Sequence, residues 1–376
     1  MKNALIRDRL VMTVCALAAT GILVAMASNF GPQSKPTVES VSGPSVFGSV
    51  DVLNLQFLGD TMIGDGAVPL VAAQGYDAPL NGVRPLLDGD FVIANAEAPI
   101  GLQTVPANPG KAYSYNSDPE AAAALRRAGV DALGLGNNHS MDMGLPGLQD
   151  TIKFASANDL LTFGAGADLT EAERPLLVRS TLGTVGIVAL GENFGQASKA
   201  SAGNSGTVVL SPATVQRGID LARTAGADWV IAYVHWGDNY QDTNAQQRYW
   251  AKMLVAAGYD LVVGTGPHTS GPIEFIGSVP VAYSIGNFVF GAPGRFASFG
   301  KSGIGLSLNV KLSRSAPTSI SVRCILADNF VVDFVPQACP DAVTRAVMPR
   351  VNPRLYVYDN AGHMDCDCLR PVRKDE

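Results

Sequence analysis

Short apolar runs alternate with helical segments along most of this chain, and this alternation restricts the fold more than any other feature. The runs typical of buried strands are Val52–Leu58, Phe91–Ala94, Ala132–Leu135, Val185–Leu190, Trp229–Val234, Leu261–Val263 and Val281–Ser284. The segments typical of helices are Pro119–Ala128, Leu145–Ala157, Pro212–Ala225 and Asn244–Ala257. Such alternation predicts an α/β fold whose sheets are buried.

The pattern changes from Gly303 onward, where strand-like segments follow one another. The segments 304–312 and 320–335 alternate like antiparallel strands, so we expect only strands here. This part also holds Cys324, Cys339, Cys366 and Cys368.

An even number of cysteines outside the cytoplasm favours two disulfides. We expect Cys366 and Cys368 to be too close in an extended chain to bond to each other, so that each pairs with Cys324 or Cys339. A small metal-binding tract that includes His363 is the alternative.

The N-terminal residues form a separate segment. Three basic residues precede an uncharged run over 10–27 that ends in Ala25-Met26-Ala27. This is typical of a secretory signal peptide, but the run also reaches the lower limit for a membrane-spanning helix. Residues 1–28 are therefore a cleaved signal or a retained anchor, and both place the rest outside the cytoplasm, either secreted or anchored to the cell membrane.

The remaining chain divides by composition. Residues 29–50 are rich in Pro, Ser and Gly and are predicted to be a linker. We expect a main domain over residues 51–312 and a β-rich extension over residues 313–376. The formal net charge is −6, and removal of residues 1–27, which hold three positive charges and one negative, would make the chain more acidic. This argues against a nucleic-acid partner, which needs a clustered basic surface.

Polar side chains follow the predicted strands where turn formation alone does not require them. They are Asp60, Asn95, Glu97, Asn137, Asn138, His139, His235, His268 and Asn287. Ligands of open α/β sheets bind beyond the carboxyl ends of the strands. Carboxylate, amide and imidazole groups there suit one or two Mn²⁺, Zn²⁺ or Fe²⁺ ions, which lower the pKa of a bound water. Asp60 could instead cap a helix or sit in a turn, Asn137-Asn138 could be a turn pair, Glu97 a solvated strand end and His235 a core imidazole, but such explanations must then hold at several strand ends together.

Six ordered motifs lie between Val52 and about Phe290. They are Gly59-Asp60-x-Met62, Asn95-x-Glu97-x-Pro99, Asn137-Asn138-His139-x-x-Asp142-x-Gly144, His235-Trp236-Gly237, Pro267-His268 with Pro272 and Glu274, and Tyr283-Ser284-Ile285-Gly286-Asn287-Phe288. Together they resemble the CapA-like family of bacterial capsule (poly-γ-glutamate) synthesis proteins, a branch of the calcineurin-like metallophosphoesterases. The resemblance implies a four-layer α/β/β/α sandwich with a metal site at its strand ends.

The resemblance also implies roles for single residues. The implied metal ligands are Asp60, Glu97, Asn138, His235 and His268. His139 would be the general acid, with Asp142 orienting its ring. Asn95, Asn137, Trp236 and Asn287 would contact the substrate or support the ligands. The family commonly has His-Pro-His where this chain has Gly266-Pro267-His268, so one imidazole is missing.

Two functions fit these features. The first is a metal-dependent hydrolase of a phosphoester or amide bond in capsule or envelope polymer synthesis. The second is a non-catalytic, membrane-anchored accessory subunit that binds or guides the polymer. For both we expect an anionic polymer partner, such as poly-γ-glutamate or an envelope phosphoester, and a membrane-bound synthase complex.

Overall fold

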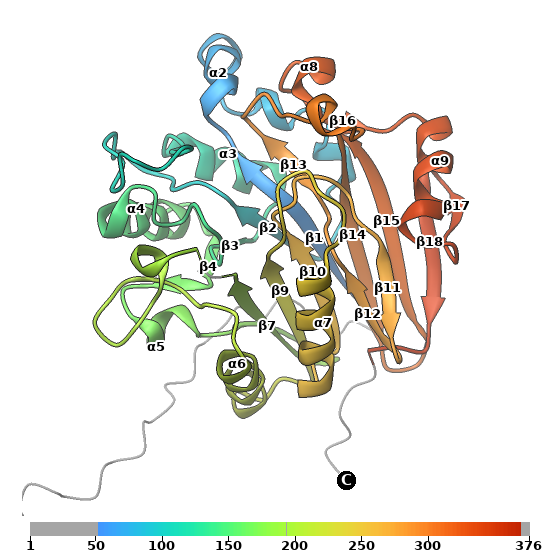
Figure 1. The fold of residues 1–376 in the computed structure, drawn as a ribbon. Helices are drawn as coiled ribbons and strands as arrows, with labels where there is room; N and C mark the ends of the chain where they lie inside the picture. Colours follow the sequence, from blue (N-terminus) through green and yellow to red (C-terminus); the bar gives the residue numbers. More distant parts are fainter. Residues whose placement is uncertain (1–51, 193, 370–376) are drawn as a thin grey trace, which may run out of the picture. The chain divides into compact units, whose positions relative to one another are not determined.

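The computed structural model describes residues 52–192 and 194–369 (Figure 1). The predicted signal or anchor and the predicted linker lie outside these residues. Among the described residues, no helix has the length and apolar character needed to cross a membrane.

The larger sheet is built around the first strand, β1 (Val52–Met62). Its order is β17-β18-β15-β14-β1-β2-β3-β4, with β13 also paired to β1 and β16 to β15. The other strands are β2 (Phe91–Ala96), β3 (Ala132–Gly134), β4 (Leu161–Phe163), β13 (Asn287–Phe290), β14 (Ile304–Ser313), β15 (Thr318–Leu326), β16 (Gln337–Ala338), β17 (Tyr356–Tyr358) and β18 (Ala361–Cys366). The strands β1 to β4 are parallel, whereas β14, β15 and β18 are antiparallel to their neighbours.

The smaller sheet has the order β11-β12-β10-β9-β7-β6. Its strands are β6 (Leu176–Ser180), β7 (Gly183–Gly191), β9 (Trp229–His235), β10 (Leu261–Thr265), β11 (Ile273–Ile276) and β12 (Val279–Ala282). A two-stranded ribbon joins β5 (Ala165–Gly166) to β8 (Gly206–Thr207). Because β7, β9 and β10 are parallel, their carboxyl ends lie at one edge of this sheet.

The two sheets pack face to face between two layers of helices (Figure 1). Inner residues of both sheets, such as Phe57 and Ile231, share one buried core. Helices α3 (Glu120–Ala128) and α4 (Gly144–Ser156) cover the outer face of the larger sheet, and α6 (Pro212–Thr224) and α7 (Ala245–Ala257) cover that of the smaller. The expected four-layer α/β/β/α sandwich is therefore confirmed.

The predicted strands and helices are all present, with ends shifted by up to a few residues. Two of the helices begin at capping boxes, in which Ser211 and Asn244 accept hydrogen bonds from backbone N–H groups of the first turn. The sequence did not indicate α2 (Val68–Gln74) or α5 (Leu169–Ala172). Short 3-10 turns lie at Asp65–Ala67, Ala78–Leu80, Arg84–Leu86, Gln196–Ser198 and Ala297–Phe299.

The expectation of strands alone after Gly303 was wrong. The chain also forms α8 (Asn329–Val332) and α9 (Asp341–Val351). Asp328 ends the strand-like run because its carboxylate accepts a hydrogen bond from the N–H of Phe330 (3.1 Å) and starts a helical turn. Helix α9 buries Thr344, Met348 and Val351, a spacing of four and three residues that presents one face to the core.

The expected cysteine pairing was also wrong. Cys324 bonds to Cys339, and Cys366 bonds to Cys368. Cys324 lies in β15 and Cys339 directly follows β16, and the two face each other because Ile325 is in register with Ala338. In the second pair the chain leaves β18 at Cys366 and bends, so the two Cα atoms are 5.2 Å apart, within bonding range.

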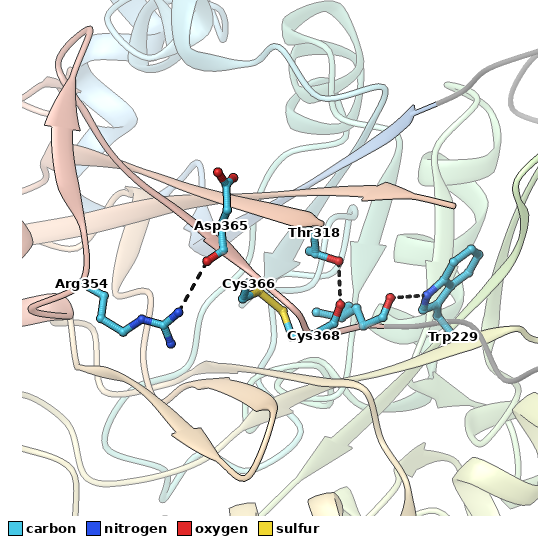
Figure 2. Close-up of a disulfide and its surroundings, with 7 residues drawn as sticks. Trp229, Thr318, Arg354, Asp365, Cys366 and Cys368 are labelled. Atoms are coloured by element: carbon cyan, nitrogen blue, oxygen red, sulfur yellow. Dashed lines mark hydrogen bonds between the residues drawn. A yellow bond between two sulfur atoms is a disulfide. The ribbon is translucent and has the colours of Figure 1, made fainter. Parts of the chain in front are cut away.

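Side chains of distant elements hold this C-terminal segment in place (Figure 2). Thr318 of β15 donates to the carbonyl of Cys368 (2.8 Å). The indole N–H of Trp229, at the start of β9, donates to the carbonyl of Leu369 (2.8 Å). The segment therefore contacts both sheets.

Removing the first disulfide is expected to destabilise the protein. The Cys324→Ala/Cys339→Ala double variant frees a loop of 15 residues, for which chain entropy predicts a loss of about 3 kcal/mol in the free energy of unfolding. Urea denaturation under oxidising conditions measures this difference. Reducing agent should bring the wild type to the level of the variant, and equal stability of the two under oxidising conditions would contradict the pairing.

Candidate metal centre

The predicted site residues gather where the carboxyl ends of strands from both sheets meet. Asp60 lies in β1, and Glu97 directly follows β2. His235 ends β9, and His268 follows β10 in the smaller sheet. Asp60 and His268 are in contact, with 3.2 Å between Oδ2 and Nδ1, so the two sheet edges share one site.

Asp60, Glu97 and His268 form a cluster that could hold a metal ion. All three are buried, and one ligand atom of each lies within 4.8 Å of the others. His268 Nε2 is 3.7 Å from Glu97 Oε1. His235 lies beside the cluster, with its Nε2 3.6 Å from the same oxygen.

Unpaired buried oxygens show that these residues fit a cation. Both carboxylate oxygens of Glu97 and the amide Oδ1 of Asn138 are buried and have no hydrogen-bond partner. A buried polar group without a hydrogen-bond partner lowers the stability of the folded protein, and an unpaired ionised carboxylate lowers it further. A divalent metal ion in the cluster would give the Glu97 carboxylate the partner that it lacks. The buried set of carboxylate, amide and imidazole groups has the chemistry of Mn²⁺, Zn²⁺ or Fe²⁺ ligands.

The electrostatics of the cluster also favour a cation. Burial, and next the charge of Asp60, raise the pKa of Glu97 well above its ordinary value. Burial also raises the pKa of Asp60, but hydrogen bonding and charge from His268 outweigh it, so the net pKa is lowered. Burial lowers the pKa of His235 to about 3, which keeps this imidazole neutral, as metal ligation requires.

A chain of amides supports the ligands. Asn137 Nδ2 donates to Asn95 Oδ1 (3.1 Å), and Asn95 Nδ2 donates to Asp60 Oδ1 (2.8 Å). On the other side, Nδ1 of His268 lies 2.9 Å from Asn287 Oδ1. An amide oxygen only accepts, so the proton is on Nδ1, and the lone pair of Nε2, on the side of Glu97, is left to bind a metal ion.

His139 stands beside the cluster, paired with a carboxylate. Its Nδ1 is 2.6 Å from Asp142 Oδ2, which places the proton between them on Nδ1 and leaves Nε2 free. Lys111 Nζ forms an ion pair with Asp142 and donates to the carbonyl of Asn138 (2.8 Å). The Tyr115 ring lies 4.5 Å from the imidazole, centroid to centroid. Burial lowers the pKa of His139, while Asp142 acts to raise it.

Three of the nine non-glycine residues with positive φ in the described part of the chain lie around the site. Asp65, Tyr240 and His268 have φ angles of 49°, 59° and 61°, a left-handed conformation that side chains rarely adopt. Such conformations cluster at functional sites, where the surrounding structure holds them. All three residues line one cavity.

Gly266 occupies the position where the resemblance to the capsule family led us to expect a histidine. Its φ is +109°, and a Cβ atom here would lie 2.7 Å from the carbonyl oxygen of Trp236. Its N–H instead points to the Asp60 carboxylate (3.2 and 3.3 Å). The backbone therefore has no room for a side chain, and the missing imidazole is part of the local structure.

The site opens into a cavity of about 200 Å³. Its lining includes His139 and His268 together with Tyr113, Tyr115, Tyr240 and Arg295. A larger cavity of about 440 Å³ lies beside it, but none of the predicted ligands lines that one. Because chemistry requires access to the ligands, we place the substrate in the smaller cavity.

One predicted site residue lies elsewhere, and several residues at the site were missed. Trp236 is buried in the core under the helices, where its indole N–H donates to the carbonyl of Tyr283 (2.8 Å). The missed residues Lys111, Tyr115, Tyr240 and Arg295 come from segments between the predicted elements. The sequence had no local signal for them, since these segments lack any helical or strand periodicity.

Comparison with known proteins places this site in context. A family model described as "Bacterial capsule synthesis protein PGA_cap" matches residues 54–292. The PGA biosynthesis protein CapA of Bacillus subtilis is 31% identical over 245 residues, which cover 64% of each chain. The capsule biosynthesis protein CapA of Bacillus anthracis is 30% identical over 247 residues, which cover 63% of this chain and 60% of that one.

Other matches are shorter or weaker. A probable polyglutamine synthesis accessory protein of Mycobacterium tuberculosis is 32% identical over 192 residues, which cover 48% of this chain and 50% of that one. Among solved structures, the NAD nucleotidase of Haemophilus influenzae superposes with a TM-score of 0.41 at 14% identity, over 72% of this chain and 49% of that one. The chain thus spans less than two thirds of the length of these relatives.

Proposed function

Because the chain belongs to the family of bacterial capsule synthesis protein PGA_cap, we propose that it is a metal-dependent hydrolase acting in the synthesis of a poly-γ-glutamate capsule. The observation that carries this proposal is the group of unpaired buried oxygens on Glu97 and Asn138, beside the paired His139 and Asp142. The names of the two Bacillus relatives support the polymer. We propose an extracytoplasmic location, secreted or membrane-anchored, on the strength of the N-terminal sequence.

The metal would be held by Asp60, Glu97, Asn138, His235 and His268. When bound, a divalent metal lowers the pKa of a water and polarises the bond to be cleaved. The chain itself supplies the proton. With Nδ1 fixed on Asp142, Nε2 of His139 is the atom that holds a proton for the leaving amine of an amide bond or the leaving oxygen of a phosphoester.

A non-catalytic accessory role is the second candidate. The backbone at Gly266 leaves no room for the additional imidazole that the family resemblance implies, which would leave the site one ligand short. A weakly held metal could then bridge the acidic protein to an anionic polymer without hydrolysing it. The Mycobacterium relative is named an accessory protein.

Metal titration and hydrolysis assays separate these functions. The full chain, purified in mild detergent, should gain thermal stability on addition of Mn²⁺ or Zn²⁺, by about 2.7 kcal/mol at a hundredfold excess over Kd. Chelation should reverse this gain. The metal-loaded chain should hydrolyse poly-γ-glutamate or bis(p-nitrophenyl) phosphate.

Each alternative has its own result. Stoichiometric metal binding with no hydrolysis of either substrate would favour the accessory role. Absence of any metal-dependent stabilisation would contradict both the hydrolase and the metal centre.

A further inference from the structure

Arg295 is held over the cavity of the metal centre by three aromatic rings. Its guanidinium carbon lies 5.4 Å from the ring centroids of Tyr113 and Tyr240 and 5.5 Å from that of Phe299. Tyr113 belongs to the segment that carries Lys111, whereas Arg295 lies between β13 and β14. Two segments distant in sequence therefore meet at this arginine, beside the opening of the site.

No carboxylate among residues 52–192 and 194–369 forms an ion pair with Arg295. Asp65 lines the same cavity but does not pair with it. Arg295 is exposed to solvent. Other arginines of the described residues do have carboxylate partners, since Arg248 pairs with Glu274 and Arg323 pairs with Asp88.

The aromatic contacts fix the guanidinium without using its hydrogen bonds. Ring faces attract the cation, while its planar N–H groups remain able to bind a carboxylate through two parallel hydrogen bonds. The backbone of Tyr240, one of the three aromatic residues, has a φ of 59°, a left-handed conformation that the surrounding structure must hold in place. An arginine fixed in this way loses little side-chain entropy when a ligand binds.

We propose that Arg295 binds the α-carboxylate of the γ-linked glutamate unit next to the bond presented to the metal centre, an inference that rests on the proposed function. In a γ-linked chain, each amide nitrogen is attached to the carbon that carries the α-carboxylate. A substrate with its amide at His139 therefore brings a carboxylate into the same cavity. Arg295 is thus a specificity residue that does not touch the reacting atoms.

Equilibrium binding tests this role independently of turnover. We would measure the Kd of a short fluorescent oligo-γ-glutamate for the metal-loaded full chain, and of the same oligomer with its α-carboxylates methylated. Arg295→Gln should weaken binding of the charged oligomer about tenfold and leave the methylated oligomer unchanged. Arg295→Lys retains the positive charge but loses the planar guanidinium, so its Kd for the charged oligomer should lie between those of the wild type and Arg295→Gln.

Arg314→Gln is the matched control. Arg314 is exposed, forms no ion pair among the described residues, and lies in the turn after β14, whose end pairs with the start of β1, away from Asp60. It should bind like the wild type. Equal Kd values for Arg295→Gln and Arg314→Gln, at equal melting temperature, would overturn the proposal. So would a wild type that binds charged and methylated oligomers equally.

A third measurement compares binding of a phosphodiester with binding of the oligo-γ-glutamate, to distinguish a phosphate ligand from a carboxylate ligand. If Arg295→Gln weakens only the binding of a phosphodiester and not of the oligomer, the carboxylate assignment is wrong. Hydrolysis is scored separately on the same proteins. If binding depends on Arg295 but no hydrolysis occurs, the carboxylate-binding role of Arg295 is supported and the hydrolase function is rejected. If hydrolysis occurs but binding does not depend on Arg295, the hydrolase function is supported and the role of Arg295 is rejected.

Discussion

Replacing His139 with alanine is expected to lower the turnover number for hydrolysis about 100- to 10,000-fold, while the metal content stays that of the wild type. The imidazole is buried beside the candidate metal ligands, and its Nδ1 is hydrogen-bonded to Asp142. Only Nε2 can therefore give a proton to the leaving group. Steady-state kinetics and metal analysis of the purified variant measure the two quantities together.

Asp142→Asn is the companion variant for this prediction. Asparagine keeps the shape but cannot stabilise a protonated imidazole, so we expect a smaller loss in turnover than for His139→Ala. Because Asp142 also forms an ion pair with Lys111, the melting temperature of the Asp142→Asn variant must be compared with that of the wild type. If His139→Ala lost its metal, or kept full activity, the imidazole would not be the proton donor.

Replacing Glu97 with glutamine is expected to abolish metal binding and at the same time stabilise the metal-free protein. Both oxygens of this buried carboxylate lack partners, and Asp60 is close enough to raise its pKa further. At a pH above the raised pKa of Glu97, a neutral amide removes the second negative charge, and its N–H can donate to Asp60. We expect the free energy of unfolding without metal to rise by about 1–3 kcal/mol, measured by urea denaturation in chelator.

Asp260 provides the matched control, because it is also a largely buried carboxylate but has its partners. It accepts hydrogen bonds from the N–H of Val230 (2.7 Å) and from Arg223 (2.9 Å). Asp260→Asn should lower stability and leave metal binding intact. A Glu97→Gln variant that is destabilised like Asp260→Asn, or that still gains stability with metal, would show that Glu97 is not a ligand.

The structure brings together polar residues that the sequence singled out at the ends of strands. Asp60, Glu97 and His268 follow apolar runs, and parallel strands bring such positions to one edge. The pairing of His139 with Asp142 could also be predicted from the sequence, because the two residues are three positions apart in one motif. The resemblance to the capsule family named these residues, and the structure brings them together.

Local patterns failed where partners come from distant segments. Lys111 reaches Asp142 from a segment without periodicity, and Trp236, placed near the site by its motif, instead packs under the helices. The cysteine pairing was wrong for a similar reason. Strand register aligns Cys324 with Cys339, and that register depends on pairing of β15 with β16.

The sequence by itself determined which segments are strands and helices and which polar residues stand at their ends, since side-chain periodicity and turn chemistry are local. Only the tertiary structure decided that the edges of two sheets share one candidate metal site and that Arg295 lines the adjoining cavity. The reason is physical: burial of apolar faces between layers sets the position of the connecting segments, and their own residues do not encode it.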